Sequence, residues 1–331
     1  MLRTTLGGCQ LSLESCIYNA SGPLSTTSEE LIQLARSDAG AILTKSCTKY
    51  FREGNIGKRY YNDQAHTYSI NSTGLANLGY NFYASFASKI KTIVSEKLKS
   101  KPYIISVAGL TLDDNLQIIN HLYTLSTTLP DAIELNLSCP NIDGKPQVSY
   151  DLDATELYLR KIFDPNSDLI NNQYVNIPIG LKLSPYFDHQ QFVNVANIIK
   201  EYPISFVTCI NSLGHGLFID WETEQTVIHP NQGHGGIGGK IIHPIAIANV
   251  RKFRQLLPDK IDVIGCGGVK TGKDVFNHIL AGASAVQVGT QYMIEGPAVF
   301  QRLNQELMDI MIQKNYQTIH DFHNQLQILP P

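Results

Sequence analysis

One cysteine stands in a setting that suits chemistry. Cys139 follows a run, Ala132–Leu137, whose alternation predicts a buried parallel strand. Pro140, Gly144 and Pro146 prevent a helix from continuing after it. Enzymes of the α/β class place reactive groups where a strand ends in a loop, so Cys139 is a candidate catalytic residue rather than a small core residue. The loop is expected to form a lid that opens for ligand exchange.

Two lysines lie inside otherwise apolar runs. Lys45 ends Ile-Leu-Thr-Lys, and Lys182 lies in Gly-Leu-Lys-Leu. Lysine is rarely buried without an anionic partner, so both are interpreted as functional. The other residues at the expected strand ends are Asn19, Ser21, Ser46, Asn136, Asn211, Ser212, Gly267, Gly268, Gly289 and Thr290. Since no carboxylate pair is among them, the set suits an anionic, planar ligand better than a sugar that needs two acids.

Two glycine-containing turns indicate a phosphate site. They are Gly265-Cys-Gly-Gly-Val269 and Gln287-Val-Gly-Thr-Gln291, and Gly236-Ile-Gly-Gly239 offers another close backbone approach. Barrels commonly bind phosphate after strands seven and eight, through backbone N–H groups. Glycine also serves simply to make a tight turn, but two such turns at the two expected strands favour a phosphate-bearing ligand.

The elements that would position these residues alternate along the whole chain. After a possible hairpin from Thr4 to Leu13, eight runs have the pattern of buried strands: Cys16–Ala20, Ala41–Lys45, Tyr103–Val107, Ala132–Leu137, Ile177–Leu183, Phe206–Ile210, Asp262–Gly265 and Ala285–Val288. Helical stretches follow them. Ser28 is expected to cap the first helix and Gly40 to end it. The sequence therefore predicts a (β/α)8 TIM barrel, an α/β fold, as one domain over residues 1–331, with inserted loops at the C-terminal mouth at 46–78 and 211–240. Asn-Ala-Ser-Gly-Pro after the first strand argues against a doubly wound sheet.

Composition narrows the class of protein. Hydrophobic residues make up 43% and charged residues 17% of the 331, which predicts a large core and little disorder. The net charge of −3 argues against nucleic-acid or membrane-surface binding. We find neither a signal peptide nor an apolar run long enough to span a membrane, and we expect a cytoplasmic protein. The six cysteines form no C-x-x-C pair, so no metal site is expected.

The remaining candidates have structural interpretations. Cys9, Cys16, Cys209 and Cys266 are expected to be inert core residues. His215, His229 and His234 match no metal-binding spacing and are interpreted as surface or loop residues. Glu134 and Asp262 lie earlier in their strands and are interpreted as structural.

Several long motifs resemble the dihydroorotate dehydrogenase family. They are Asn71-Ser-Thr-Gly-Leu75, Asn136-Leu-Ser-Cys-Pro-Asn141, Leu181-Lys-Leu-Ser-Pro-Tyr-Phe-Asp188, Asn211-Ser-Leu-Gly-His-Gly-Leu217, Gly235-Gly-Ile-Gly-Gly239 and the two glycine turns. The cysteine at position 139 is similar to the soluble class, because the membrane-associated class has serine in that role. The tail from Tyr316 to His323 resembles the homodimeric, fumarate-reducing branch.

The resemblance implies oxidation of (S)-dihydroorotate to orotate in pyrimidine (UMP) biosynthesis, with FMN as cofactor, fumarate as acceptor, and Cys139 as the base that removes the C5 proton. The implied FMN contacts are Ser21, Lys45, Ser46, Asn136, Lys182, Ile210, Gly238, Gly267, Gly268, Gly289 and Thr290. The implied substrate contacts are Lys45, Asn71, Ser72, Thr73, Gly74, Leu75, Asn136, Asn141, Asn211 and Ser212.

Three positions depart from the family's pattern. Thr73 stands where methionine is frequent, Ala76 where proline is frequent, and His215 where asparagine is common. Thr73 and Ala76 fall in the substrate loop, so binding strength is expected to differ there. His215 would add a pH-sensitive contact near the substrate carboxylate.

Other functions stay open at this point. The same half-reaction could reduce NAD through a partner subunit, or act on a related dihydropyrimidine. A flavin-free barrel lyase or isomerase could bind a sugar phosphate at the same turns, and a flavin-binding scaffold need not catalyse anything.

Overall fold

Eight parallel strands curve into a barrel, as the sequence predicts. In the computed structural model their hydrogen-bonded order is β3-β16-β15-β10-β9-β8-β7-β4. The structure describes residues 1–96, 100–125, 128–139, 147–164 and 177–330. The barrel strands are β3 (Ile17–Asn19), β4 (Ile42–Leu43), β7 (Tyr103–Val107), β8 (Ala132–Asn136), β9 (Ile179–Leu183), β10 (Phe206–Cys209), β15 (Asp262–Cys266) and β16 (Ala285–Val288).

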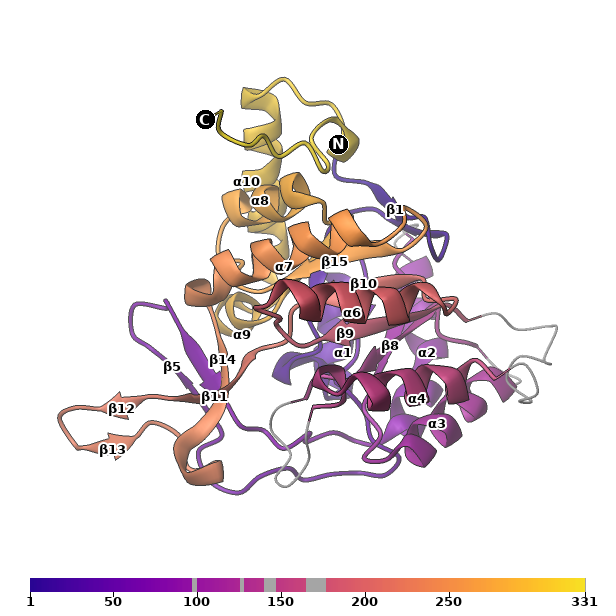
Figure 1. The fold of residues 1–331 in the computed structure, drawn as a ribbon, viewed down its shortest axis with the longest axis vertical. Coiled ribbons are helices and arrows are strands. Elements are labelled where there is room, and N and C mark those ends of the chain that lie inside the picture. The colour runs from indigo at the N-terminus through magenta and orange to yellow at the C-terminus, as the bar shows by residue number, and fades with distance from the viewer. Residues whose placement is uncertain (97–99, 126–127, 140–146, 165–176, 331) are drawn as a thin grey trace.

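Helices surround the barrel and pack against their neighbours in chain order, α3 on α4, α4 on α6, α6 on α7 and α7 on α8 (Figure 1). Their inner faces join the strands in one continuous hydrophobic core. The helices are α1 (Ser28–Arg36), α2 (Tyr80–Ser95), α3 (Leu112–Thr124), α4 (Leu152–Ile162), α6 (His189–Lys200), α7 (His243–Leu256), α8 (Gly272–Ala281), α9 (Thr290–Glu295) and α10 (Ala298–Gln313).

The barrel closes between β3 and β4 through a side chain. Asn19 Nδ2 donates to the Leu43 carbonyl at 2.6 Å, and the Leu43 N–H donates to Asn19 Oδ1 at 3.0 Å. Asn19 is fully buried, and its two bonds join the seam together with the backbone bond from the Gly40 N–H to the Ile17 carbonyl at 2.7 Å. The sequence predicts Asn19 among the groups at the mouth, but its amide serves barrel closure instead.

The two long excursions meet above the barrel, which the sequence did not predict. They supply a four-stranded antiparallel sheet of order β11-β14-β6-β5. Its strands are β5 (Tyr60–Asn62), β6 (Ser69–Asn71), β11 (Leu213–Leu217) and β14 (His234–Gly238). Strands β5 and β6 have three residues each, and β11 and β14 contain glycine, so none shows the alternation that marks a strand in a sequence. The pairing of β6 with β14 joins segments more than 140 residues apart, and it positions the loop that follows β6.

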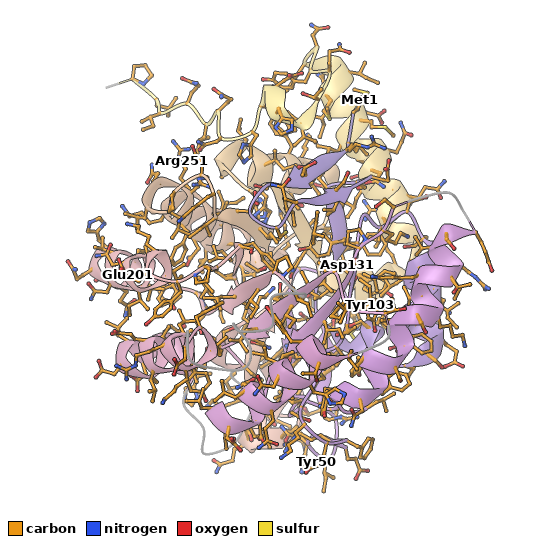
Figure 2. All side chains as sticks on the ribbon, turned by 90° about the vertical axis from the view of Figure 1, so that its right-hand side faces the viewer. Met1, Tyr50, Tyr103, Asp131, Glu201 and Arg251 are labelled. Atoms are coloured by element: carbon orange, nitrogen blue, oxygen red, sulfur yellow. The ribbon has the colours of Figure 1, made fainter. Side chains whose placement is uncertain are left out.

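Smaller elements complete the chain. The expected N-terminal hairpin is confirmed as β1 (Thr4–Leu6) and β2 (Leu11–Leu13), and β12 (Ile219–Asp220) pairs with β13 (Gln225–Thr226) in an arm that projects from the body (Figure 1). Figure 2 shows Met1 and Tyr50, which follows β4, at opposite ends of the molecule. The 3-10 helices are η1 (Pro23–Ser25), η2 (Val148–Tyr150), η3 (Pro230–Gly233), η4 (Lys240–Ile242) and η5 (Ile319–Asp321).

The expected ends of the first helix were wrong. Thr27, not Ser28, is the N-cap, because its side chain accepts the Glu30 N–H while the Glu30 carboxylate accepts the Thr27 N–H. The helix ends at Arg36, four residues before Gly40. Gly40 has another role: a Cβ there would lie 1.7 Å from the Ser15 carbonyl oxygen, so only glycine allows the two backbones to approach.

We predict that Gly40→Ala lowers the free energy of unfolding by about 3 kcal/mol, since the clash is with backbone atoms that cannot turn aside. Urea unfolding followed by circular dichroism measures the loss. Gly7→Ala is the matched control: an added Cβ there meets no heavy atom within 4 Å, so its effect should stay within about 0.5 kcal/mol. Equal stability of the two variants would contradict the close approach.

Candidate active site

A cavity of about 1120 Å³, including its open mouth, lies at the carboxyl ends of the barrel strands. It contains Cys139 and every residue that the resemblance assigns to the cofactor. Those residues are Ser21, Lys45, Ser46, Asn136, Lys182, Ile210, Gly238, Gly267, Gly268, Gly289 and Thr290. Five further substrate candidates also line it: Asn71, Thr73, Leu75, Asn211 and Ser212. The fold thus gathers side chains from seven strand ends and from the small sheet.

Two of the expected substrate residues lie outside the cavity lining. Ser72 is fully buried, and its hydroxyl accepts from the Asn55 and Asn231 side-chain amides, both at 3.2 Å. The Gly74 carbonyl accepts from Arg52 Nε at 3.2 Å. Both residues therefore shape the loop that carries Thr73 and Leu75. Asn141, and the lid residues Pro140, Gly144 and Pro146, fall outside the described residues.

Sequence reasoning missed several residues of the cavity wall, notably Tyr60, Ser69 and Gln287. Ser69 Oγ lies 2.8 Å from Thr290 Oγ1, which joins the small sheet to the end of β16. Tyr60 and Ser69 carry no sequence signal, since they belong to the irregular-looking excursion. Gln287 did carry one: it is the only polar residue in the apolar strand Ala-Val-Gln-Val.

The two mouth lysines are buried without a carboxylate partner among the residues that the structure describes. Lys45 is 7% exposed and Lys182 is 5% exposed, and the Lys182 ammonium donates to Gln287 Oε1 at 2.8 Å. Burial lowers the pKa of Lys45, and the nearby Cys139 thiolate opposes that shift. By contrast, buried Lys101 donates to three backbone carbonyls at the end of α1. The cavity therefore concentrates positive charge that an anionic ligand would neutralise.

Serine and asparagine side chains form a fixed floor beside the lysines. Ser46 Oγ lies 2.8 Å from Ser21 Oγ and accepts from Asn136 Nδ2 at 3.0 Å. Asn136 Oδ1 in turn accepts from Asn211 Nδ2 at 3.3 Å. Asn211 Nδ2 also donates to the Ser138 carbonyl at 3.2 Å. Because each amide is held by a neighbour, the floor is preorganised for a planar ligand with its own donors and acceptors.

Burial keeps most of the cysteine thiols protonated and therefore weakly reactive. Desolvation raises the pKa of Cys9 and Cys16 to about 12, and raises that of Cys47 and Cys209 strongly as well. Cys139 is partly exposed and lines the cavity. The expectation that Cys9, Cys16 and Cys209 lie in the core is confirmed; Cys266 is buried too, but it reaches the cavity wall.

The histidines of the second excursion do not gather into a metal site. His215 and His234 stack with ring centroids 4.6 Å apart. Within the described ranges, no group of three or more His, Cys, Asp and Glu side chains could hold a metal ion. Across the same ranges, no helix has the length and apolar character needed to cross a bilayer.

Known proteins match the chain over nearly its whole length. The family model described as dihydroorotate dehydrogenase matches residues 1–311. The chain belongs to the dihydroorotate dehydrogenase family. It is 43% identical to a putative dihydroorotate dehydrogenase A (fumarate) of Streptococcus equi subsp. equi over 100% of both chains. It is 44% identical to the dihydroorotate dehydrogenase (fumarate) of Trypanosoma cruzi over 94% of each chain.

Two further comparisons agree. The Lactococcus lactis subsp. lactis dihydroorotate dehydrogenase A (fumarate) is 42% identical over 99% of this chain and 100% of that protein. The crystal structure of the Eimeria tenella dihydroorotate dehydrogenase in complex with ferulenol has a TM-score of 0.78. It covers 97% of this chain and 87% of that one at 18% identity, so it supports the barrel fold alone.

Membership of the family implies a flavin cofactor, and the glycine turn after β15 fits its phosphate end. Gly267 and Gly268 have φ of 127° and 72°, in the region that favours glycine. A Cβ on Gly268 would lie 2.4 Å from His243 Cα, so a side chain cannot fill this cradle without moving α7. Gly289 differs, because a Cβ there would meet only Ala20 at 3.7 Å.

A buried histidine supports this turn. The ring of His278, in α8, places Nε2 3.0 Å from the Gly267 carbonyl oxygen. Since a carbonyl only accepts, Nε2 carries the proton. Burial, reinforced by neighbouring His243, lowers the pKa of His278 to about 3. His278 is therefore neutral at the base of the cradle.

This shift predicts an acid-dependent loss of stability. A histidine whose pKa is lower in the folded state contributes stability above its unfolded value of about 6.5, and that stability is lost as the pH falls toward 3. Between pH 7 and pH 5, wild-type protein should lose about 2 kcal/mol more unfolding free energy than His278→Gln, whose amide can still donate to Gly267. Urea unfolding at both pH values measures the difference. Equal losses would show that His278 does not titrate as its burial requires.

Proposed function

We propose that the chain oxidises (S)-dihydroorotate to orotate with FMN bound in the barrel mouth and fumarate as the electron acceptor. One observation carries the proposal: the cavity of a dihydroorotate dehydrogenase family member holds Lys45 and Lys182 beside Cys139, without a carboxylate from the described residues. This arrangement suits an anionic substrate that must lose a proton.

The cofactor would occupy the inner part of the cavity. Its phosphate would lie against Gly267, Gly268, Gly289 and Thr290, and its ring system near Lys182. The remaining contacts would come from Ser21, Lys45, Ser46, Asn136, Ile210 and Gly238. Bound there, FMN supplies a hydride acceptor for C6 of the substrate. Lys182 would stabilise the negative charge that gathers on the ring.

Cys139 would act as the general base at C5. A base needs its charged form to be favoured at the working pH, and the Lys45 ammonium attracts the Cys139 thiolate. The partial exposure of Cys139 allows it to reach substrate, whereas the four deeply buried thiols stay protonated.

Lys45 would pair with the substrate carboxylate, and the amide floor would bind the pyrimidine ring. Asn71, Asn136, Asn211 and Ser212 line the cavity with suitable donors and acceptors, and Asn141 is assigned to the same role from the resemblance alone. Thr73 and Leu75 would add backbone contacts, held in place by Ser72 and Gly74. Fixed amides favour a planar product over a flexible competitor.

Fumarate is proposed because relatives in three genera, at 42–44% identity over at least 94% of the chain, bear that acceptor in their names. Reduction of NAD through a partner subunit is the alternative. Membership of the dihydroorotate dehydrogenase family argues against the other hypothesis, a flavin-free lyase or isomerase of a sugar phosphate.

A homodimer is also proposed. Trp221 and Ile219, on the β12–β13 arm, are 82% and 65% exposed, and Leu217 before them is 43% exposed. The arm projects from the barrel (Figure 1), and an apolar projection of this kind is typical of a surface covered by another chain. From the sequence, we also propose that residues 1–331 form a single domain and that the protein is cytoplasmic.

The role of Cys139 gives a direct test. Cys139→Ala should keep the flavin, because Cys139 is one of many residues around the cavity, but slow flavin reduction by dihydroorotate about 10²–10⁴-fold. Stopped-flow absorbance without oxygen measures the rate. Cys9→Ala, in the N-terminal hairpin, is the matched control and should reduce at the wild-type rate. A Cys139→Ala rate close to wild type would refute the assignment of the base.

The acceptor gives a second test. The isolated chain should turn over dihydroorotate with fumarate, because fumarate, like dihydroorotate, is a small carboxylate anion that the same cationic cavity can bind. NAD and a quinone should support at least tenfold slower turnover, measured by orotate formation at equal concentrations. Turnover with NAD alone would replace fumarate in the proposal and leave the dihydroorotate half-reaction intact.

A further inference from the structure

A chain of buried polar side chains crosses the barrel interior directly beneath the cavity. Lys182, on β9, donates to Gln287 Oε1 at 2.8 Å, and Gln287 Nε2 donates to Glu134 Oε2 at 2.7 Å. Gln287 lies on β16 and Glu134 on β8. Thr208 Oγ1, on β10, donates to the same Glu134 oxygen at 2.8 Å. A buried cation and a buried carboxylate are thus joined through a single amide.

Burial makes this arrangement energetically significant. Gln287 and Thr208 are fully buried, Glu134 is 1% exposed and Lys182 is 5% exposed. Charges in such surroundings are screened little, so the separation between the lysine and the carboxylate controls how strongly each acts on a third group. Removing either one leaves the other without its compensating charge.

The orientation of the Gln287 amide follows from chemistry. An ammonium only donates and a carboxylate only accepts, so Oε1 must face Lys182 and Nε2 must face Glu134. Nε2 also donates to the Tyr18 hydroxyl at 3.2 Å. Because the second N–H is used in this way, the amide cannot turn over without losing bonds on both sides.

Only the cationic end of this chain reaches the cavity. Lys182 and Gln287 line it, whereas Glu134, Thr208 and Tyr18 do not. The other carboxylate oxygen of Glu134, Oε1, has no hydrogen-bond partner among the described residues. The Gln287 amide therefore keeps Lys182 close enough to Glu134 to be compensated, yet holds it out of a direct ion pair that would cancel its charge toward the cavity.

We propose that Gln287 and Glu134 are positioning residues that set the reduction potential of the bound flavin through Lys182. The inference rests on the proposed function, since it takes the ligand beside Lys182 to be a flavin. Two-electron reduction places negative charge on the flavin, and the Lys182 ammonium stabilises it. Gln287 fixes where that ammonium lies, and Glu134 limits how much of its field the flavin receives.

Two isosteric substitutions should shift the potential in opposite directions. Glu134→Gln removes a buried negative charge, so the equilibrium constant for flavin reduction should rise at least tenfold, a shift of about +30 mV for two electrons. Gln287→Glu places a carboxylate against Lys182 itself, so the constant should fall at least tenfold, about −30 mV. Each change replaces one terminal atom and preserves side-chain volume.

Asp262→Asn is the matched control. Asp262 is a buried carboxylate on neighbouring strand β15, where it accepts from Ser284 Oγ at 2.6 Å and from the Gly8 N–H at 2.9 Å. It does not line the cavity, so the same carboxylate-to-amide change should leave the potential unchanged. A general loosening of the barrel would affect all three variants alike.

The measurement is a dye-equilibrated reductive titration of each purified holoenzyme, with a chemical reductant and no dihydroorotate. Opposite shifts support the proposal. Shifts of the same sign, or potentials in both variants equal to wild type, overturn it. If one variant does not accumulate in folded form, the sign of the other decides. A wild-type protein that holds flavin but does not oxidise dihydroorotate contradicts the proposed function alone, and its potentials still test the roles of Gln287 and Glu134.

Discussion

Buried positive charge at the barrel mouth is the constraint on which the rest of the site depends. Lys45 and Lys182 lose most of their hydration on folding, and an unpaired buried cation is costly. The fold offsets this cost for Lys182 through an amide and a distant carboxylate, and it leaves Lys45 next to a thiol. Because neither lysine forms a direct ion pair with a carboxylate of the described residues, both remain able to attract an anionic ligand. Ligand binding then completes the electrostatics that the chain leaves incomplete.

The neutral side chains near the lysines hydrogen-bond to one another or to the barrel. Asn136 and Asn211 bond to each other, and Asn19 serves the barrel seam instead of the cavity. The same side chain, asparagine at a strand end, therefore has two roles. Which role it has depends on the neighbour: Asn19 faces β4 where the ladder is open, and Asn136 faces the cavity.

The small sheet above the barrel pairs segments of the two excursions, which together form one wall of the cavity. Gly236 pairs with Asn71, and the Asn71 amide donates to the Gly236 carbonyl at 3.2 Å. In this way, the loop after β6 and the glycine segment of β14 face the same cavity. Glycine is needed here for contact rather than for flexibility, since a Cβ on Gly235 would lie 2.5 Å from the Asn71 carbonyl oxygen.

The sequence alone determined the eight strands, the strand ends and the two glycine turns, because apolar runs and glycines are local signals that survive without a partner. It also singled out Lys45 and Lys182, which are charged residues within apolar runs, and Cys139, which is a thiol in a polar loop interrupted by proline. Only the tertiary structure decided that Ser72 and Gly74 lie behind the cavity, that Gly40 serves a close approach, and that Gln287 links Lys182 to Glu134. Those roles depend on distances between residues 17 to 159 positions apart, and no local pattern encodes such a distance.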